Sequence, residues 1–307
     1  MLHRLPRTRA TVLAALALAL TGSLAACGGA GPAAEPSAAG GTIAVVASTN
    51  VYGSIAEAIG GERVSVHSII AKPGQDPHSY EATAQDKLAV SKAALGIENG
   101  GGYDDFFDKL AGGQLDAAKL LNVVQLSGLT TGDGFNEHLW YNLSTMGTLA
   151  DTLAARFGAL DSAHAATFTA NATAFKATLG GLETRLAALK AADGGAPVAV
   201  TEPVPLYLLE AAGLANKTPA GFSQAIEEGT DVPATVLKEA TDLMGSGTVK
   251  FLAYNTQTEG PATELVKKAA EAAHVPVVDF SETLPAGTDY AGWMGTNVAD
   301  IESALRR

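Results

Sequence analysis

The chain has 307 residues, of which 47% are hydrophobic, and its 20 basic and 32 acidic side chains give a net charge of −12. This acidic balance argues against nucleic acid as a partner, because the phosphates would be repelled. Cys27 is the single cysteine, so an intramolecular disulfide and a thiolate metal cluster are excluded. Any bound metal must therefore be held by nitrogen and oxygen ligands.

The N-terminal segment predicts export and attachment to a membrane. Three arginines within residues 4–9 precede an apolar run at residues 10–20, which is the layout of a secretory signal. The run is shorter than the ~20 apolar residues of a membrane-spanning helix. The sequence Leu24-Ala25-Ala26-Cys27 resembles a bacterial lipobox. We expect residues 1–27 to be a signal peptide and Cys27 to carry lipid, on the extracytoplasmic face of the cell membrane; an ordinary signal with an incidental cysteine is the alternative.

Residues 28–41 contain no large apolar side chain, and their Gly, Ala, Pro and Ser content predicts a flexible tether. Apolar strands then alternate with helical stretches. Strands are expected at residues 42–48, 64–70, 94–98 and 122–126, and helices at residues 51–59, 83–92 and 104–110. This alternation predicts a parallel sheet with helices on both faces, in an N-terminal α/β lobe over residues 42–160.

The middle of the chain is helical. One helix is expected at residues 145–157, and an Ala-rich run at residues 161–192 has apolar side chains at spacings of three, four and seven. A continuous helix of that length would span roughly 45 Å, long enough to run along two lobes. The pair Gly180-Gly181 leaves open whether this linking helix is interrupted.

The strand–helix alternation resumes in the last third of the chain. Strands are expected at residues 196–201, 249–254 and 275–280, and helices at residues 233–244, 261–273 and 289–305. The predicted fold class is therefore α/β, with two lobes that each have a mostly parallel sheet flanked by helices. One long helix joins them, and the C-terminal lobe covers residues 193–307.

Two histidines stand on loops that follow predicted strands. His78 follows the strand at 64–70, in a loop stiffened by prolines, and His138 follows a Gly-rich loop after the strand at 122–126. The carboxyl ends of parallel strands share one edge of a sheet, where ligands bind. These two imidazoles can therefore converge, although a loop histidine on its own is more often not a ligand.

The loop around His78 has a distinctive sequence. Its sequence, Lys72-Pro73-Gly74 followed by Asp76-Pro77-His78-Ser79-Tyr80-Glu81, resembles the first metal-binding loop of the manganese/zinc solute-binding lipoproteins of ABC importers. The resemblance continues at Asn99-Gly100, at His138-Leu139-Trp140, at Asn171 in the long helix, at residues 207–214 and at the last strand with Asp279. It covers nearly all of residues 42–307.

The resemblance implies a metal site in the cleft between the lobes. Its ligands would be His78, His138, Glu202 and Asp279, each at or just beyond a predicted strand end. The ligand would be one divalent transition metal ion, with Mn²⁺ favoured, Zn²⁺ close behind and Fe²⁺ possible. A lipid-anchored, monomeric protein would deliver this ion to an ABC permease, without catalysis.

Three departures from the family pattern bear on the metal. Asn136-Glu137 stands where the family usually has Asp-Pro, Glu202 replaces a histidine common in zinc importers, and no His-rich insertion separates His78 from His138. Two imidazoles and two carboxylates are a harder ligand set, which suits Mn²⁺, although the Irving–Williams order still predicts tighter binding of Zn²⁺ in isolation.

Two other function classes are left open by the sequence. A two-lobed protein can bind an organic solute or siderophore, because fold alone does not set the ligand. A zinc-dependent hydrolase would need three protein ligands and an open position, and the chain has no HExxH motif. An additional role as an adhesin is neither indicated nor excluded.

Overall fold

The computed structural model describes residues 41–72, 75, 77–78, 80–132 and 134–307. The predicted signal peptide, the lipid-bearing Cys27 and all but the last residue of the tether lie outside the described residues. Among the helices of the described part, none is both long and apolar enough to cross a membrane.

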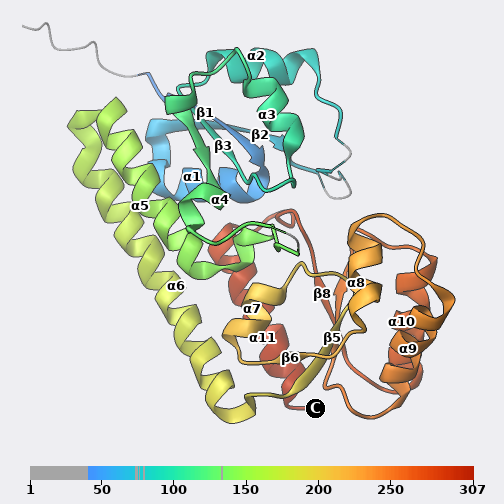
Figure 1. Ribbon diagram of the computed structural model, residues 1–307. Coiled ribbons are helices and arrows are strands. Elements are labelled where there is room, and N and C mark those ends of the chain that lie inside the picture. The colour runs from blue at the N-terminus through green and yellow to red at the C-terminus, as the bar shows by residue number, and fades with distance from the viewer. Residues whose placement is uncertain (1–40, 73–74, 76, 79, 133) are drawn as a thin grey trace, which may run out of the picture. The chain divides into compact units, whose positions relative to one another are not determined.

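The first half of the described chain is built on a four-stranded sheet (Figure 1). Its strands are β1 (Ile43–Thr49), β2 (Val64–Ile70), β3 (Leu95–Glu98) and β4 (Leu120–Asn122). The strand order is β2-β1-β3-β4, and every pairing is parallel. The central strand β1 is buried along almost its whole length, as expected of a parallel strand covered on both faces.

Helices cover both faces of this sheet. They are α1 (Asn50–Gly60), α2 (Ala84–Lys92), α3 (Asp105–Ala111), α4 (Val123–Ser127) and α5 (Leu143–Leu160), with short 3-10 turns at Gly61–Arg63, Ala117–Lys119, Leu139–Tyr141 and Ser162–His164. Helices α1 and α5 contribute to the main hydrophobic core. Helices α2 and α3 pack on the other face in a smaller core that includes Val90, Phe106 and Phe107.

The predicted strand at residues 122–126 is wrong, because β4 ends at Asn122 and a helix begins at once. The Asn122 side chain accepts a hydrogen bond from the Gln125 backbone N–H, which caps α4 at its N-terminus. Gly128 ends the helix in the left-handed region, with φ of 66°. A short apolar run flanked by an N-cap and a C-terminal glycine forms a helical turn here despite its valines.

Helix α6 (Ala165–Asp193) is the long linking helix, and it runs unbroken through Gly180 and Gly181. Its 29 residues span about 43 Å at about 1.5 Å per residue. Its buried side chains form one stripe of Phe168, Ala172, Phe175, Leu179, Leu182 and Leu186. Along its length α6 packs against α1 and α5 of the first half and against α11 of the second (Figure 1).

The second half repeats the arrangement of the first. Its strands are β5 (Pro197–Val200), β6 (Ala215–Asn216), β7 (Leu252–Asn255) and β8 (Val277–Phe280), and its helices are α7 (Leu206–Ala211), α8 (Ala220–Glu227), α9 (Ala234–Gly245), α10 (Pro261–Ala272) and α11 (Tyr290–Leu305). The order is β6-β5-β7-β8, again all parallel. The predicted fold class is confirmed; α7, β6 and α8 were not predicted.

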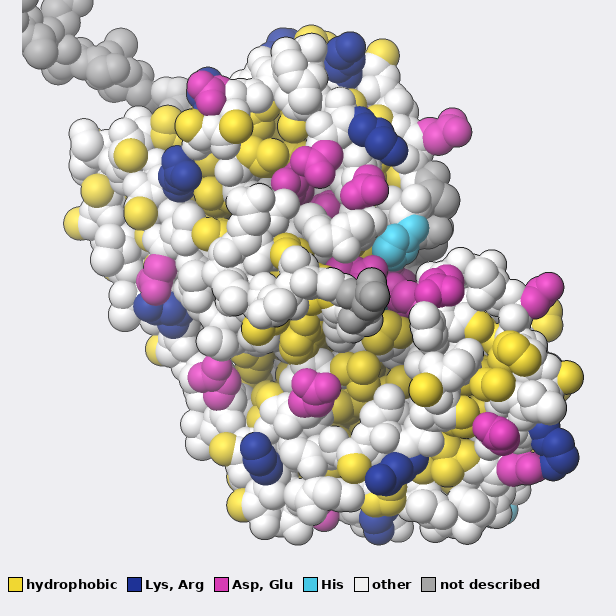
Figure 2. Space-filling view, viewed as in Figure 1, with side chains coloured by type: hydrophobic (Ala, Val, Ile, Leu, Met, Phe, Trp, Pro, Cys, Tyr) yellow, Lys and Arg dark blue, Asp and Glu magenta, His cyan; other side chains and the backbone are white. Residues whose placement is uncertain are grey.

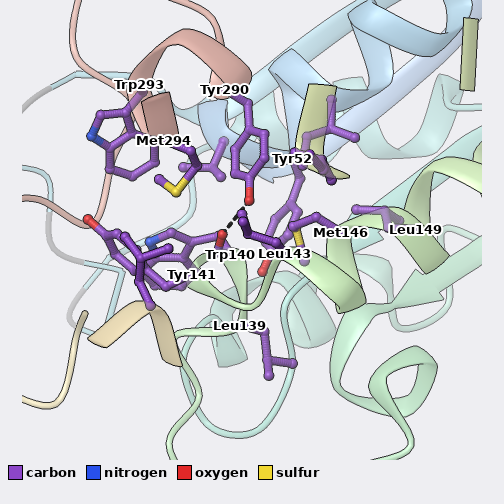
Figure 3. Close-up of a cluster of buried hydrophobic side chains, with 14 of the residues drawn as sticks. Tyr52, Leu139, Trp140, Tyr141, Leu143, Met146, Leu149, Tyr290, Trp293 and Met294 are labelled. Atoms are coloured by element: carbon purple, nitrogen blue, oxygen red, sulfur yellow. Dashed lines mark hydrogen bonds between the residues drawn. The ribbon is translucent and has the colours of Figure 1, made fainter. Parts of the chain in front are cut away.

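An aromatic cluster joins the two halves (Figure 3). The Tyr290 hydroxyl donates a hydrogen bond to the Trp140 carbonyl at 2.6 Å, and the Tyr141 hydroxyl donates to the Ser281 carbonyl at 2.8 Å. The ring of Trp293 meets Tyr141 edge-on at 5.5 Å. Residues 41–307 form one compact unit, so the lobe boundaries at 160 and 192 stay predictions.

Candidate metal site

Polar side chains gather where the carboxyl ends of both sheets face each other. His78 lies in the loop after β2, Glu202 two residues beyond β5, and Glu282 two residues beyond β8. In each sheet the chain order reverses beside the first strand, which is where α/β folds bind ligands. Figure 2 shows a histidine and acidic side chains gathered where the two halves of the described chain meet.

His138 is prepared to act as a metal ligand through its Nε2 atom. The side chain is only 1% exposed, and its Nδ1 lies 2.7 Å from the Asn136 Oδ1. The Asn136 amide nitrogen donates to the Pro203 carbonyl, so the amide oxygen is the atom that faces the imidazole. Nδ1 therefore carries the proton, and the Nε2 lone pair points the other way. Burial lowers the pKa of His138 to about 3, with a further contribution from His78, so the ring is neutral.

Glu227, the last residue of α8, reaches both histidines. Its Oε1 lies 3.8 Å from the His78 Nε2 and 3.7 Å from the His138 Nε2. This oxygen is buried and has no hydrogen-bond partner among the described residues. Burial first, and then the nearby charges of Glu137, Glu202 and Glu282, together raise the pKa of Glu227 to about 9. The Glu227 carboxyl group is therefore desolvated, lies among other acidic groups and holds its proton near neutral pH.

His78, Glu137 and Glu227 form a compact group of potential ligands. One ligand atom from each lies within 4.8 Å of the others. In the described part of the chain, this is the group of at least three His, Cys, Asp or Glu residues that lie close enough together to hold one metal ion. Glu137 stands next to His138, and the Asn99 side-chain amide donates a hydrogen bond to the Glu137 backbone carbonyl at 3.0 Å. Both halves of the chain thus contribute to the group.

Glu202 and Glu282 form a deeper pair, 3% and 6% exposed. Asn255, at the end of β7, donates through its Nδ2 to Glu202 and, at 2.8 Å, to Glu282. The Thr258 hydroxyl also donates to Glu202, and the Tyr103 hydroxyl donates to Glu282 at 3.3 Å. These bonds hold both carboxylates in fixed orientations, as supporting groups do around metal sites.

Buried aromatic rings form the wall behind the imidazoles. Tyr103 meets His78 edge-on with ring centroids 5.2 Å apart and lies 5.9 Å from His138. The Trp140 ring lies 5.1 Å from His138. An apolar wall limits access of water and strengthens electrostatic interactions within the site.

Of the residues expected to bind metal, His78 and His138 lie beside Glu227. Glu202 is near enough to raise the pKa of Glu227, whereas Asp279 lies on an exposed surface. Asp279 is exposed on β8 and lines a surface hollow with Asp300, Ser303 and Arg307. Its strand neighbours Val278 and Phe280 are buried, so the pleat directs Asp279 away from the core. The carboxylate that reaches the site from this strand end is Glu282.

Sequence reasoning did not single out Glu282, Glu227 or Glu137 as candidate ligands. Glu202 and Glu282 stand at equivalent places, because each lies two residues beyond the end of its strand. In β8 every second residue is buried, and continuing this alternation past Phe280 puts Glu282, not Asp279, on the buried side. Glu227 gave no signal, because α8 was not predicted.

Comparison with known proteins identifies the family. Residues 45–304 match the family described as zinc-uptake complex component A periplasmic. The chain therefore belongs to this family of metal ABC transporter substrate-binding proteins, which are not enzymes.

Solved structures share the fold. The periplasmic zinc-binding protein TroA from Treponema pallidum superposes with a TM-score of 0.71 at 20% identity, covering 87% of this chain and 100% of the other. The Mn²⁺ complex of FpvC from Pseudomonas aeruginosa superposes with a TM-score of 0.68 at 21% identity, covering 87% and 99%.

Curated relatives carry different metals in their names. The manganese transporter lipoprotein ScaA of Streptococcus gordonii is 30% identical over 175 residues, which are 53% of this chain and 55% of that protein. The manganese-binding lipoprotein MntA of Halalkalibacterium halodurans is 28% identical over 141 residues (45% and 47%). The iron transporter lipoprotein MtsA of Streptococcus pyogenes serotype M1 is 29% identical over 150 residues (44% and 47%). The chain thus spans about half the length of these relatives.

Proposed function

We propose that this protein captures a divalent transition metal ion outside the cytoplasmic membrane and delivers it to the permease of an ABC importer. The observation that carries the proposal is the convergence of the two imidazoles of His78 and His138 on Glu227, a carboxylate from the other half of the chain. Membership of the family supports it. Attachment through lipid on Cys27, and action as a monomer, belong to the same proposal.

In the proposed site His78, His138, Glu202 and Glu282 bind the ion. Two neutral imidazoles and two carboxylates balance the charge of one divalent cation. Asn136 orients one imidazole, and Asn255 orients both carboxylates. This nitrogen–oxygen set suits Mn²⁺ and also accepts Fe²⁺ and Zn²⁺. Manganese is the proposed cargo because oxygen supplies half of the protein ligands and because two of the relatives above are named for manganese.

The contacts between the halves indicate how release would work. Besides α6, hydrogen bonds tie the His138 loop to the second half: the Tyr207 hydroxyl donates to the Asn136 carbonyl at 2.7 Å, and Asn136 donates to Pro203. A wide hinge opening would break these bonds and the aromatic cluster. Local movement of the loops that carry the ligands is the less costly route, and the permease would drive it.

The metal site is tested by elemental analysis and native mass spectrometry of the wild type and of single variants purified without chelator. Wild-type protein is expected to hold one ion, and His78→Ala and Glu282→Gln are expected to lose it. Asp279→Asn is the matched control, because it removes a carboxylate from the same segment at an exposed position outside the cluster. Loss of metal from Asp279→Asn with retention in Glu282→Gln would contradict the proposed ligands. An organic molecule bound instead of an ion would contradict the proposed cargo.

A further inference from the structure

The site has more carboxylates than one divalent ion requires. Glu202 and Glu282 already balance its charge in the proposed ligand set. Glu137 and Glu227 bring two more carboxyl groups within reach, and the Glu227 Oε1 is buried without a hydrogen-bond partner among the described residues. Burial of surplus carboxyl groups without hydrogen-bond partners costs free energy. A chain that keeps these groups together is expected to use them at another stage of binding.

The two groups of ligands differ in their access to solvent. His78 has a side chain that is 36% exposed, and Glu137 is half-buried, whereas His138 is 1% exposed. Glu202 and Glu282 are nearly as deep as His138 and are already hydrogen-bonded to Asn255. An ion that arrives from solvent therefore meets the outer group first.

Glu227 connects the outer group with the inner one. Its Oε1 lies at nearly the same distance from the two imidazole Nε2 atoms, 3.8 Å for His78 and 3.7 Å for His138. An ion held by Glu227 and His78 needs to shift only by a few ångströms to gain His138 as a ligand. Glu137 belongs to the outer group, and its backbone is fixed by Asn99 independently of its side chain.

We propose that His78, Glu137 and Glu227 form an outer capture position, which the metal ion occupies before Glu227 passes it to His138, Glu202 and Glu282. The inference rests on the proposed function, because it describes how the ion reaches the proposed site. His78 stays bound to the ion during the transfer. Glu137 is a ligand only at the capture position.

The role of Glu137 is tested by stopped-flow mixing of the metal-free protein with Mn²⁺ alone. The fluorescence of Trp140, 5.1 Å from His138, reports arrival at the inner site. Glu137→Gln is expected to slow association and dissociation by the same factor, about tenfold, and to leave Kd within about threefold, because only the path is altered. Glu228→Gln is the matched control, since it removes the same charge from the exposed neighbour of Glu227. It is expected to bind at the wild-type rate.

A second variant separates capture from final binding. Glu282→Gln is expected to raise Kd mainly through faster dissociation, because Glu282 holds the ion at the inner site. If Glu137→Gln associates as fast as Glu228→Gln, the capture position is refuted. If Glu137→Gln raises Kd at an unchanged association rate, Glu137 is a ligand of the final site, which also refutes it. Wild-type protein that binds no Mn²⁺ at equilibrium would instead overturn the proposed function itself.

Discussion

Glu98, the last residue of β3, is a buried carboxyl group whose protonation is coupled to folding. It is 2% exposed, its Oε1 accepts a hydrogen bond from the Asn122 amide at 2.8 Å, and its Oε2 has no hydrogen-bond partner among the described residues. Burial first, and then the charges of Asp108 and Asp104, together raise the pKa of Glu98 from 4.5 to about 8. The folded protein therefore holds a proton here that the unfolded chain gives up.

The sign of the pH dependence follows from this raised pKa. Below pH 4.5 Glu98 is protonated in both the folded and the unfolded protein, so it does not make the free energy of unfolding depend on pH. Between pH 4.5 and about 8 the folded state alone retains the proton, so stability falls as pH rises. Each unit of pH inside this window removes up to about 1.4 kcal/mol from the free energy of unfolding. Glu98→Gln keeps an acceptor for Asn122 and carries no charge, so this contribution disappears.

Urea unfolding of the metal-free protein at pH 5, 6, 7 and 8, followed by circular dichroism, measures the effect. The free energy of unfolding of Glu98→Gln minus that of the wild type is expected to increase by about 2–4 kcal/mol across this range. Glu57→Gln, at an exposed position of α1, serves as the control and should run parallel to the wild type. Parallel curves for Glu98→Gln as well would refute the reasoning, because they would mean that Glu98 is ionised in the folded protein.

Helix α6 gives two further predictions. Gly181→Ala is expected to raise the free energy of unfolding, measured by urea unfolding, by about 1 kcal/mol. The reason is that an added Cβ meets no atom within 4 Å and that alanine is the better helix former. An unchanged or lower free energy of unfolding would contradict an unbroken helix. Phe168→Ala leaves a cavity at a fully buried position against Phe157, and it is expected to lower the free energy of unfolding by about 3–5 kcal/mol. Thr169→Ala, at the exposed neighbouring position, is the control and should change the free energy of unfolding by less than about 1 kcal/mol.

Much of the fold could be predicted because its long elements have strong patterns. The apolar stripe of α6 and the continuous apolar runs of the parallel strands depend only on local spacing. The failures lie in short segments. In α4 an Asn cap outweighed the strand preference of two valines, and α7, β6 and α8 are too short to show a period. Their positions are set by packing between distant parts of the chain.

Residues of the candidate site could be predicted only where a recognisable local sequence pattern surrounds them. His78 and His138 stand in recognisable loops, and Glu202 follows a clear strand. Asp279 is acidic and close to a strand end, but the pleat of β8 turns it outward, and Glu282 is the carboxyl group from this segment that joins Glu202 at Asn255. Glu227 joins the histidines through the tertiary placement of α8, which no local pattern shows.

Anomalous X-ray diffraction from crystals of the protein loaded with Mn²⁺ tests the central claim most directly, because it locates the ion without assumptions about its ligands. We predict a single strong peak between the two halves, about 2.0–2.3 Å from the Nε2 atoms of His78 and His138 and from carboxylate oxygens of Glu202 and Glu282. A peak beside Asp279, or no ordered ion between the halves at saturating Mn²⁺, would contradict the account.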